Sequence, residues 1–205
     1  MTGRPRDPAV DDAIRRAALE LVGEHGYRGV SMEAIAARSG VSKQAIYRRH
    51  ASKGEVMLDA QAAFARTRLP TPDTGDLRED LLALLEETFS GQRGVNGALN
   101  RALAAEALQD DAFSELLNER LIRQRRDAVR LILARARERG EVAHPSDDLL
   151  IDLVFGPMWY ALLLDPGKLT AEYAATLTDA VLAVARSHGR PESRTNSPTS
   201  GNTAG

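Results

Sequence analysis

The 205-residue sequence predicts an all-α fold, and three observations support it. The chain is rich in alanine, leucine, glutamate and arginine, which are strong helix formers. Apolar residues recur at spacings of three and four along most of its length, as on one face of a helix. No run alternates like a β-strand. We expect about nine helices, forming an N-terminal three-helix helix-turn-helix domain and a C-terminal helical bundle.

The first helix is predicted to begin with Asp7 as its cap and Pro8 at its first position, where proline is favourable. Gly26 ends it. Ser31 can then cap a second helix, and Gly40 supplies the permissive backbone of a tight turn. The sequence predicts two short helices joined by that turn.

Ser42 caps the third helix, in which Ala45 and Ile46 can face inward. The outward positions hold Lys43, Gln44, Tyr47 and Arg48. A helix-turn-helix places its second helix in the major groove of DNA, with its N-terminal residues nearest the base edges. This pattern predicts a DNA-binding function.

A fourth helix opens with the capping box from Ser52 to Glu55 and continues to about Arg68. The turn-rich segment 69–75 follows. We therefore expect a DNA-binding domain over 1–68, which includes the start of helix 4, and a second helical domain over 69–188. Residues 189–205 contain almost no apolar side chain and are expected to form a disordered tail.

The second domain is predicted to hold five helices, each bounded by glycine, proline or polar turn residues. Their expected ranges are 77–89, 98–109, 112–139, 145/146–164 and 170–188. The long helix expected over 112–139 carries eight arginines interspersed with acidic residues, and we interpret these arginines as a solvated, partly ion-paired face. They are Arg120, Arg123, Arg125, Arg126, Arg130, Arg135, Arg137 and Arg139.

Composition and charge exclude several classes of protein. Without cysteine there are no disulfides, thiolate metal sites or cysteine nucleophiles. The four histidines are scattered, and no catalytic or phosphate-binding motif is present, so we expect no metal, no cofactor and no enzyme activity. No segment approaches the ~20 apolar residues of a membrane span, and the N-terminus lacks a secretory signal. A cytoplasmic protein is the expectation.

The net charge of −2 conceals an asymmetry. Residues 1–66 carry 11 Lys/Arg against 8 Asp/Glu, whereas the remainder holds 16 against 21. A basic region at one end of an acidic protein suits a small DNA footprint.

The combined motifs resemble the TetR family of transcriptional regulators. The resemblance covers residues 10–66 and rests on GYRGVSMEAIA, SGVSKQAIYRRHASK and the following helix, in the family's order and spacing. DLLIDLVFGPMWYALLL is similar to a C-terminal domain type of the family. The chain departs from the family pattern at His50, where an aromatic or aliphatic residue is usual, and at Gly54, where an acid is frequent.

The resemblance implies roles for individual residues toward a double-stranded DNA operator. The start of the recognition helix would approach base edges, Tyr47 and Lys53 would contact phosphates, and Arg4 and Arg6 could form a minor-groove arm. Each residue taken alone could equally be a surface cap or a solvated cation. The candidate DNA-binding residues are Ser31, Ser42, Lys43, Gln44, Ala45, Tyr47, Arg48 and Lys53.

The segment 149–164 is apolar on nearly every side, and such a helix must be buried on every side. We expect the last two helices to form a symmetric homodimer interface. Its candidate residues are Leu150, Val154, Met158, Leu162, Leu177, Val181 and Val184.

The family also implies a pocket for a small-molecule effector within the C-terminal domain, although an apolar stripe is usually only core. Candidate walls are Phe64, Leu85, Phe89, Asn100, Leu103, Phe113, Leu117 and Trp159. The expected function is a ligand-responsive transcriptional regulator, and more often a repressor, that binds a palindromic operator as a homodimer. The alternative is an all-helical small-molecule-binding protein or enzyme with no DNA role.

Overall fold

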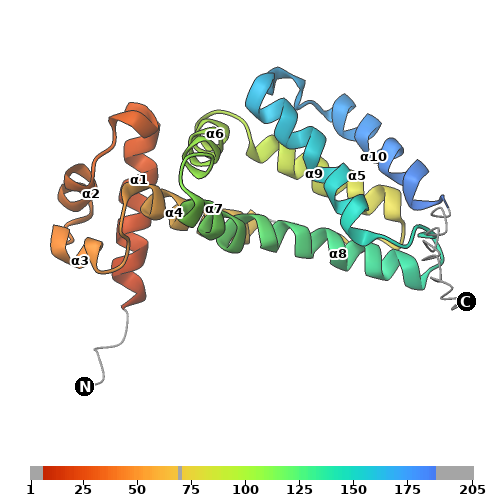
Figure 1. Cartoon of the computed structure of the whole chain (residues 1–205), viewed down its shortest axis with the longest axis horizontal. Coiled ribbons are helices and arrows are strands. Elements are labelled where there is room, and N and C mark those ends of the chain that lie inside the picture. Colours follow the sequence, from red (N-terminus) through yellow and green to blue (C-terminus); the bar gives the residue numbers. More distant parts are fainter. Residues whose placement is uncertain (1–6, 69–70, 188–205) are drawn as a thin grey trace, which may run out of the picture.

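The computed structural model describes residues 7–68 and 71–187, with side chains undescribed at 67 and 68. Within these ranges the chain is helical, as Figure 1 shows. The helices are α1 (Pro8–Gly29), α2 (Met32–Ser39), α3 (Lys43–Tyr47), α4 (Lys53–Arg68), α5 (Leu77–Gly91), α6 (Val95–Ala107), α7 (Asp111–Leu117), α8 (Arg123–Glu138), α9 (Asp147–Leu164) and α10 (Ala171–Ala185). The π-helical turn η1 (Asn118–Ile122) lies between α7 and α8, and the 3₁₀ turn η2 (Pro166–Lys168) precedes α10.

The prediction of an all-α fold with nine helices is confirmed for the described residues, because α7, η1 and α8 form one continuous rod. The residues at both junctions, Asn118 and Arg123, keep α-helical backbone angles. The long helix predicted over 112–139 therefore exists, with a π turn that the sequence did not reveal. The predicted arm residues Arg4 and Arg6 and the predicted tail 189–205 lie outside the described residues.

Local caps fix the helix starts as predicted. The Asp7 carboxylate accepts a hydrogen bond from the Ala9 amide at 3.0 Å, and Ser52 Oγ accepts one from the Glu55 amide at 3.2 Å. Gly26 interrupts α1 with φ of 67°, so the chain bends there before the last residues of that segment. Each cap satisfies an otherwise orphaned amide of a first turn.

Helix α6 begins at Val95, three residues before its predicted start at 98. The prediction was wrong because Gly97 was interpreted as part of a glycine-interrupted link. In the structure Gly97 is helical and buried, and a Cβ added there would overlap the carbonyl oxygen of Gln92. Here glycine marks a close backbone approach rather than a break.

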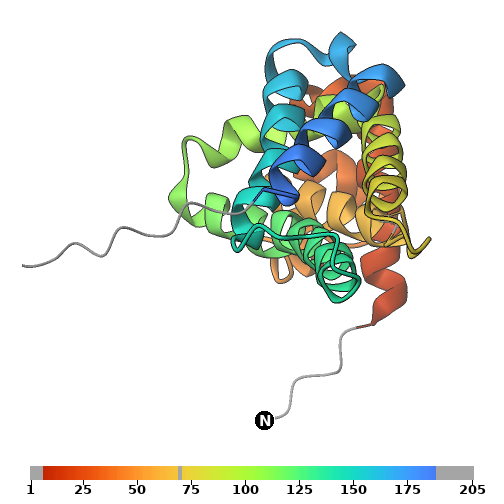
Figure 2. The ribbon, with the colours of Figure 1, turned by 90° about the vertical axis from the view of Figure 1, so that its right-hand side faces the viewer.

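Two hydrophobic clusters form the core, and they do not divide at the predicted boundary after residue 68. One joins α1–α4 to Leu99 and Leu103 of α6, Phe113 and Leu117 of α7, and Leu121 of η1. The other consists of α5, α8, α9 and α10. Figure 1 shows α6 and α7 next to the N-terminal helices, while α9 and α10 lie toward the opposite end, which faces the viewer in Figure 2. The N-terminal domain is thus packed onto part of the C-terminal one.

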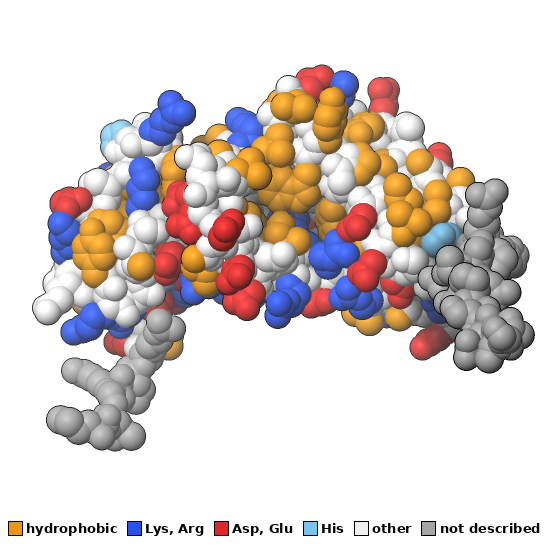
Figure 3. All heavy atoms as spheres, viewed as in Figure 1, with side chains coloured by type: hydrophobic (Ala, Val, Ile, Leu, Met, Phe, Trp, Pro, Cys, Tyr) orange, Lys and Arg blue, Asp and Glu red, His pale blue; other side chains and the backbone are white. Residues whose placement is uncertain are grey.

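The predicted dimer residues require a correction. Six of them, Leu150, Val154, Met158, Leu162, Leu177 and Val181, are buried in the protomer's own core, and Val184 packs against it. The six buried residues therefore present almost no surface to a second chain, whereas Val184 is half-buried. The apolar residues of α9 that remain exposed are Leu149, Tyr160, Leu163 and Leu164. Figure 3 shows apolar side chains gathered over the α9 and α10 end of the molecule.

Among the described residues, no helix is both long enough and apolar enough to span a membrane.

Candidate nucleic-acid interface

The helix-turn-helix consists of α2, the turn at Gly40 and α3. Ser31 Oγ accepts a hydrogen bond from the Ala34 amide at 3.1 Å and begins α2. Gly40 has φ of 69°, in the left-handed region that glycine tolerates best. Ser42 Oγ then accepts a hydrogen bond from the Ala45 amide at 3.2 Å and begins α3. Both serines predicted to touch DNA are therefore helix caps, and both are exposed.

Helix α3 is held by one fully buried side chain, Ile46, with Ala45 half-buried. The remaining predicted contact residues, Lys43, Gln44, Tyr47 and Arg48, are exposed, and Tyr47 retains 47% of its accessible surface. The side chains of Gln44 and Arg48 form no hydrogen bond or ion pair with another residue of the described ranges. These groups face solvent and are available to a partner.

Lys43 forms an ion pair with Glu33 of α2, and its ammonium lies 5.8 Å from the centre of the Tyr47 ring. Hydrogen bonding within the pair raises the pKa of Lys43 and lowers the pKa of Glu33. Because both side chains are exposed, the pair is screened by solvent and does not withdraw Lys43 from other partners.

Arg49 differs from its neighbour Arg48. Its guanidinium donates from Nε to the Asp11 carboxylate at 2.8 Å and from Nη1 to the Ala45 carbonyl at 3.1 Å. The side chain is mostly buried, so it fastens α3 to α1 and is not placed at the exposed face of α3.

Lys53, a predicted phosphate contact, is half-buried at the start of α4. Its ammonium donates to the carbonyl oxygens of Tyr27 and Val30, both at 3.1 Å, and lies 4.7 Å from the centre of the Tyr27 ring. Two of its three donors therefore stabilise the end of α1. The sequence gave no signal of this role, because the carbonyls lie more than twenty residues away in the chain.

The unusual Gly54 has a physical explanation. The Glu106 carboxylate of α6 occupies the space where a side chain at 54 would lie, and it accepts a hydrogen bond from the Tyr27 hydroxyl. Burial, together with that carboxylate, raises the pKa of Tyr27 above its usual range. An acid supplied by α6 thus lies beside the position where the family frequently carries one.

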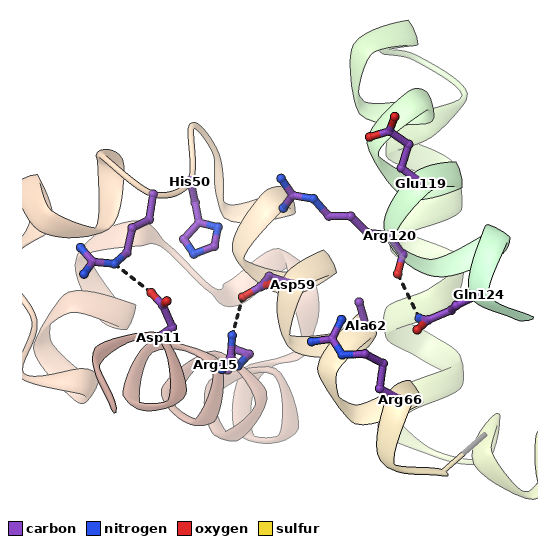
Figure 4. A pocket seen from close by; sticks show the side chains of 10 residues that line it. Asp11, Arg15, His50, Asp59, Ala62, Arg66, Glu119, Arg120 and Gln124 are labelled. Carbon is purple, nitrogen blue, oxygen red and sulfur yellow. Dashed lines mark hydrogen bonds and ion pairs between the residues drawn. The ribbon is translucent and has the colours of Figure 1, made fainter. Parts of the chain in front are cut away.

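His50 is buried, with 6% of its surface exposed, so the ring packs as an aromatic residue would. It lines a cavity of about 490 Å³ between the N-terminal helices and η1, shown in Figure 4. Ion pairs from Arg15 to Asp59 at 3.0 Å and from Arg49 to Asp11 at 2.8 Å flank the ring. Burial lowers the pKa of His50, and its Nδ1 has no hydrogen-bond partner among the described residues.

The residues predicted to wall an effector pocket do not surround one cavity. Leu103, Phe113 and Leu117 belong to the N-terminal core cluster, and Leu85 and Phe89 to the other. Asn100 is buried and donates to Gln92 at 2.7 Å. Phe64 and Trp159 line cavities, but these are two different cavities. The two leucines and the phenylalanines of these clusters, together with Leu117, are core residues because neighbouring helices pack against the helix faces that carry them.

The arginine-rich face of α8 is ion-paired as predicted at five positions: Arg126, Arg130, Arg135, Arg137 and Arg139. Arg125 is the exception. It is half-buried, lies four residues after the buried Leu121 and four before the buried Val129, and forms no ion pair with a described residue. Burial lowers its pKa.

Two family profiles match this chain. Residues 14–60 match the family described as bacterial regulatory proteins, tetR family, and residues 71–181 match the tetracyclin repressor-like C-terminal domain. The matched ranges include the helix-turn-helix and α5 to most of α10.

Curated relatives and solved structures agree. The chain is 31% identical over 176 residues to the HTH-type transcriptional regulator YdeS of Bacillus subtilis, covering 85% of this chain and 89% of that protein. It is 30% identical over 175 residues to the DNA-binding transcriptional repressor TetR of Mycobacteroides abscessus, covering 84% and 91%. The crystal structure of the TetR family transcription regulator SCO0332 superposes with a TM-score of 0.76 at 29% identity, covering 85% of this chain and 97% of that one. The helix-turn-helix, the C-terminal helices and these relatives together establish that the chain belongs to the TetR family of DNA-binding transcriptional regulators.

Proposed function

We propose that this regulator is a repressor that binds a palindromic operator as a homodimer and is released by a small-molecule effector. The observation that carries the proposal is the capped helix α3, whose Lys43, Gln44 and Tyr47 are exposed together while Ile46 anchors it. Gln44 can pair bidentately with adenine in the major groove, and Lys43 with guanine or phosphate. Ser31, Ser42, Ala45, Arg48 and the third donor of Lys53 complete the proposed interface.

A second copy of this chain is the proposed partner of the exposed face of α9. Leu149, Leu153, Tyr160 and Leu163 follow one another at helical spacings, and Tyr160 keeps 64% of its surface exposed. The adjoining exposed positions of α10, Ala180 and Ala183, are small enough for two helices to approach closely. Regulators of this family typically act as dimers, and a dimer that reads two half-sites must hold its recognition helices one helical turn of DNA (~34 Å) apart.

Release by an effector requires that the effector prefer the conformation in which the two α3 helices are wrongly spaced. A preference of ~100-fold corresponds to about 2.7 kcal/mol of coupling between the sites. The proposed route by which effector binding changes the position of α3 is helix α6, because its Leu99 and Leu103 lie within the same core cluster as the N-terminal helices. The relative from Mycobacteroides abscessus, described as a repressor, supports the direction of the effect.

The test measures binding of the purified full chain to DNA fragments from upstream of its own gene by fluorescence anisotropy. We expect binding that weakens steeply with salt and is lost in Tyr47→Ala and Gln44→Ala. Gln109→Ala, at an exposed position after α6, is the matched control and should bind as the wild type. A folded dimer that binds none of these fragments, or binding that survives both substitutions in α3, would contradict the proposal.

A further inference from the structure

Two neighbouring cavities in the C-terminal domain meet at Arg125. The larger, about 210 Å³, is lined by Ile122, Phe155, Gly156 and Trp159, by the Arg125 side chain, and by Arg126 and Asp152, which form an ion pair with each other. The smaller, about 20 Å³, is lined by Gln61, Phe64 and Thr88, and again by Arg125. The Arg125 cation therefore lies between a mostly apolar chamber and a smaller recess, called the polar recess because it contains the buried polar groups of Gln61 and Thr88.

The polar recess contains hydrogen-bonding groups that nothing in the described chain satisfies. Gln61 is 1% exposed and Thr88 is 4% exposed. Neither Gln61 Oε1 nor Thr88 Oγ1 has a hydrogen-bond partner among the described residues. Buried polar atoms are nearly always paired in native proteins, so two unpaired atoms in one recess indicate a place for a polar ligand atom.

Arg125 lacks a counter-charge as well. It forms no ion pair with any described residue, although Arg126 beside it pairs with Asp148 at 3.0 Å and with Asp152. Burial lowers the pKa of the Arg125 guanidinium, and no carboxylate acts against that effect. Glu87 also lines the recess, yet it contributes no such compensation. A half-buried cation that has lost part of its hydration and has no partner is costly, which favours a bound anion that would offset that cost.

We propose that this site binds a small organic acid, with its carboxylate on Arg125 and its apolar body against Trp159 and Phe155. A guanidinium matches a carboxylate in a bidentate, charge-assisted geometry. A donor group next to the carboxylate, such as a hydroxyl, would satisfy Gln61 or Thr88. The volume lies below the ~300–1,000 Å³ of sites for drug-sized ligands, which limits the ligand to a compact molecule.

Binding of the acid does not require DNA and can be tested without it. Only the role of the acid as the effector rests on the proposed function. Trp159 is the single tryptophan of the chain and lines the apolar chamber, so its fluorescence reports on occupancy. The probes are benzoate and salicylate, compared with their neutral isosteres benzamide and salicylamide. They are titrated into the purified full chain while Trp159 fluorescence and the thermal midpoint are recorded.

We expect both acids to change Trp159 fluorescence and raise the midpoint, with an affinity about tenfold or more above that of the amides. Arg125→Gln should abolish this preference for acids, whereas Arg123→Gln, an exposed arginine of the same helix, should leave it unchanged. The acid–amide comparison needs no variant, so misfolding of Arg125→Gln would not obscure the result.

Equal binding of acids and amides, unchanged binding by folded Arg125→Gln, or no response to either acid at millimolar concentration would overturn the inference. Acid binding that leaves the affinity for DNA unchanged would instead reject the effector role while keeping the site. Failure of the unliganded protein to bind DNA would reject the proposed function alone.

Discussion

The hydroxyl of Tyr27, at the end of α1, donates a hydrogen bond to the carboxylate of Glu106 on α6, 79 residues further along the chain. Tyr27 also contributes its carbonyl and its ring face to Lys53 at the start of α4. One tyrosine therefore joins three helices where the DNA-binding domain meets the C-terminal domain. The contact is possible because Gly54 leaves room for the carboxylate.

Tyr27→Phe should lower the free energy of unfolding by about 1–3 kcal/mol, because the charged Glu106 would lose a partly buried hydrogen-bond donor. Urea unfolding at a fixed protein concentration measures the change. Tyr173→Phe is the control, since that ring stacks on Phe89 at 5.9 Å and its hydroxyl bonds to no other described residue. Gly54→Ala should cost a similar amount by displacing Glu106, and this cost should vanish in a Glu106→Ala background. Equal stability of Tyr27→Phe and wild type would contradict the assignment.

Gly97→Ala should be strongly destabilising, because the added methyl group would overlap the backbone oxygen of Gln92, which cannot rotate away. Gly23→Ala offers the opposite case. No atom lies within 4 Å of the added group at this exposed position inside α1, so we expect a gain of about 0.5–1 kcal/mol. Thermal unfolding of the two variants should move the midpoint in opposite directions. A tolerated Gly97→Ala would show that α6 does not approach Gln92 so closely.

The stability of the protein should depend on pH through His50. Burial lowers the pKa of this group in the folded state, so the unfolded chain binds more protons. The contribution of neutral His50 to the free energy of unfolding is complete above the pKa of the unfolded chain, about 6.5. This contribution is lost as the pH falls from that value toward the lower pKa of the folded state. The charges that also act on the pKa of His50 are Asp59, Glu55 and Asp11, which raise it, and Arg120, which lowers it.

The comparison that isolates this effect is His50→Phe against wild type, by urea unfolding across about pH 5–8. The variant should lose the wild-type decline below about pH 6.5, because it has no proton to bind at this site. His25→Phe, at an exposed position, should keep the wild-type slope. A His50→Phe variant with the full decline would assign it to other groups.

Glu33→Gln should strengthen binding to DNA, because it removes a negative charge beside the proposed contact surface and releases Lys43 from its ion pair. Lys43→Gln should weaken binding and reduce the salt slope by about 0.9 if the ammonium contacts one phosphate. Anisotropy titrations over a range of salt measure both. Glu115→Gln, an exposed acid on α7, should bind as the wild type does. A weaker Glu33→Gln would indicate that its carboxylate positions α3.

Leu163→Glu should convert the proposed dimer into a monomer, because a charge on the exposed apolar face of α9 cannot be desolvated at low cost. Sedimentation velocity distinguishes the two states. Leu108→Glu introduces the same charge at a leucine that is more exposed but lies at the end of α6. That variant should remain dimeric. Dimers of Leu163→Glu would place the interface elsewhere.

The local features of the fold were predictable from the sequence. Caps at Asp7, Ser31 and Ser42 depend on neighbouring amides, so residue type and spacing suffice. The exposed side chains of α3 followed from the burial of Ile46 in the same way.

Features set by distant segments were not predictable. The burial of the predicted interface residues of α9 within the protomer was not predictable, because a helix that is apolar all round has no amphipathic phase to show which side the protomer itself uses. Arg125 was predicted to lie on a solvated face because the prediction used the charge composition of the whole helix. The side of the helix that other helices cover depends on tertiary packing, which the composition does not show. Lys53 and Tyr27 meet through tertiary contacts that their own sequence surroundings do not encode.

The shared core of the N-terminal helices with α6, α7 and η1 also bears on how this protein could be recombined with its relatives. Leu99, Leu103 and Phe113 are covered by residues of the DNA-binding domain, so a chimera joined in the segment 69–75 would cut through a hydrophobic core. Transplanting the operator specificity of another regulator would succeed more readily by exchanging the exposed residues of α3 alone. The same contact means that mutations in α1 and α6 cannot drift independently during evolution.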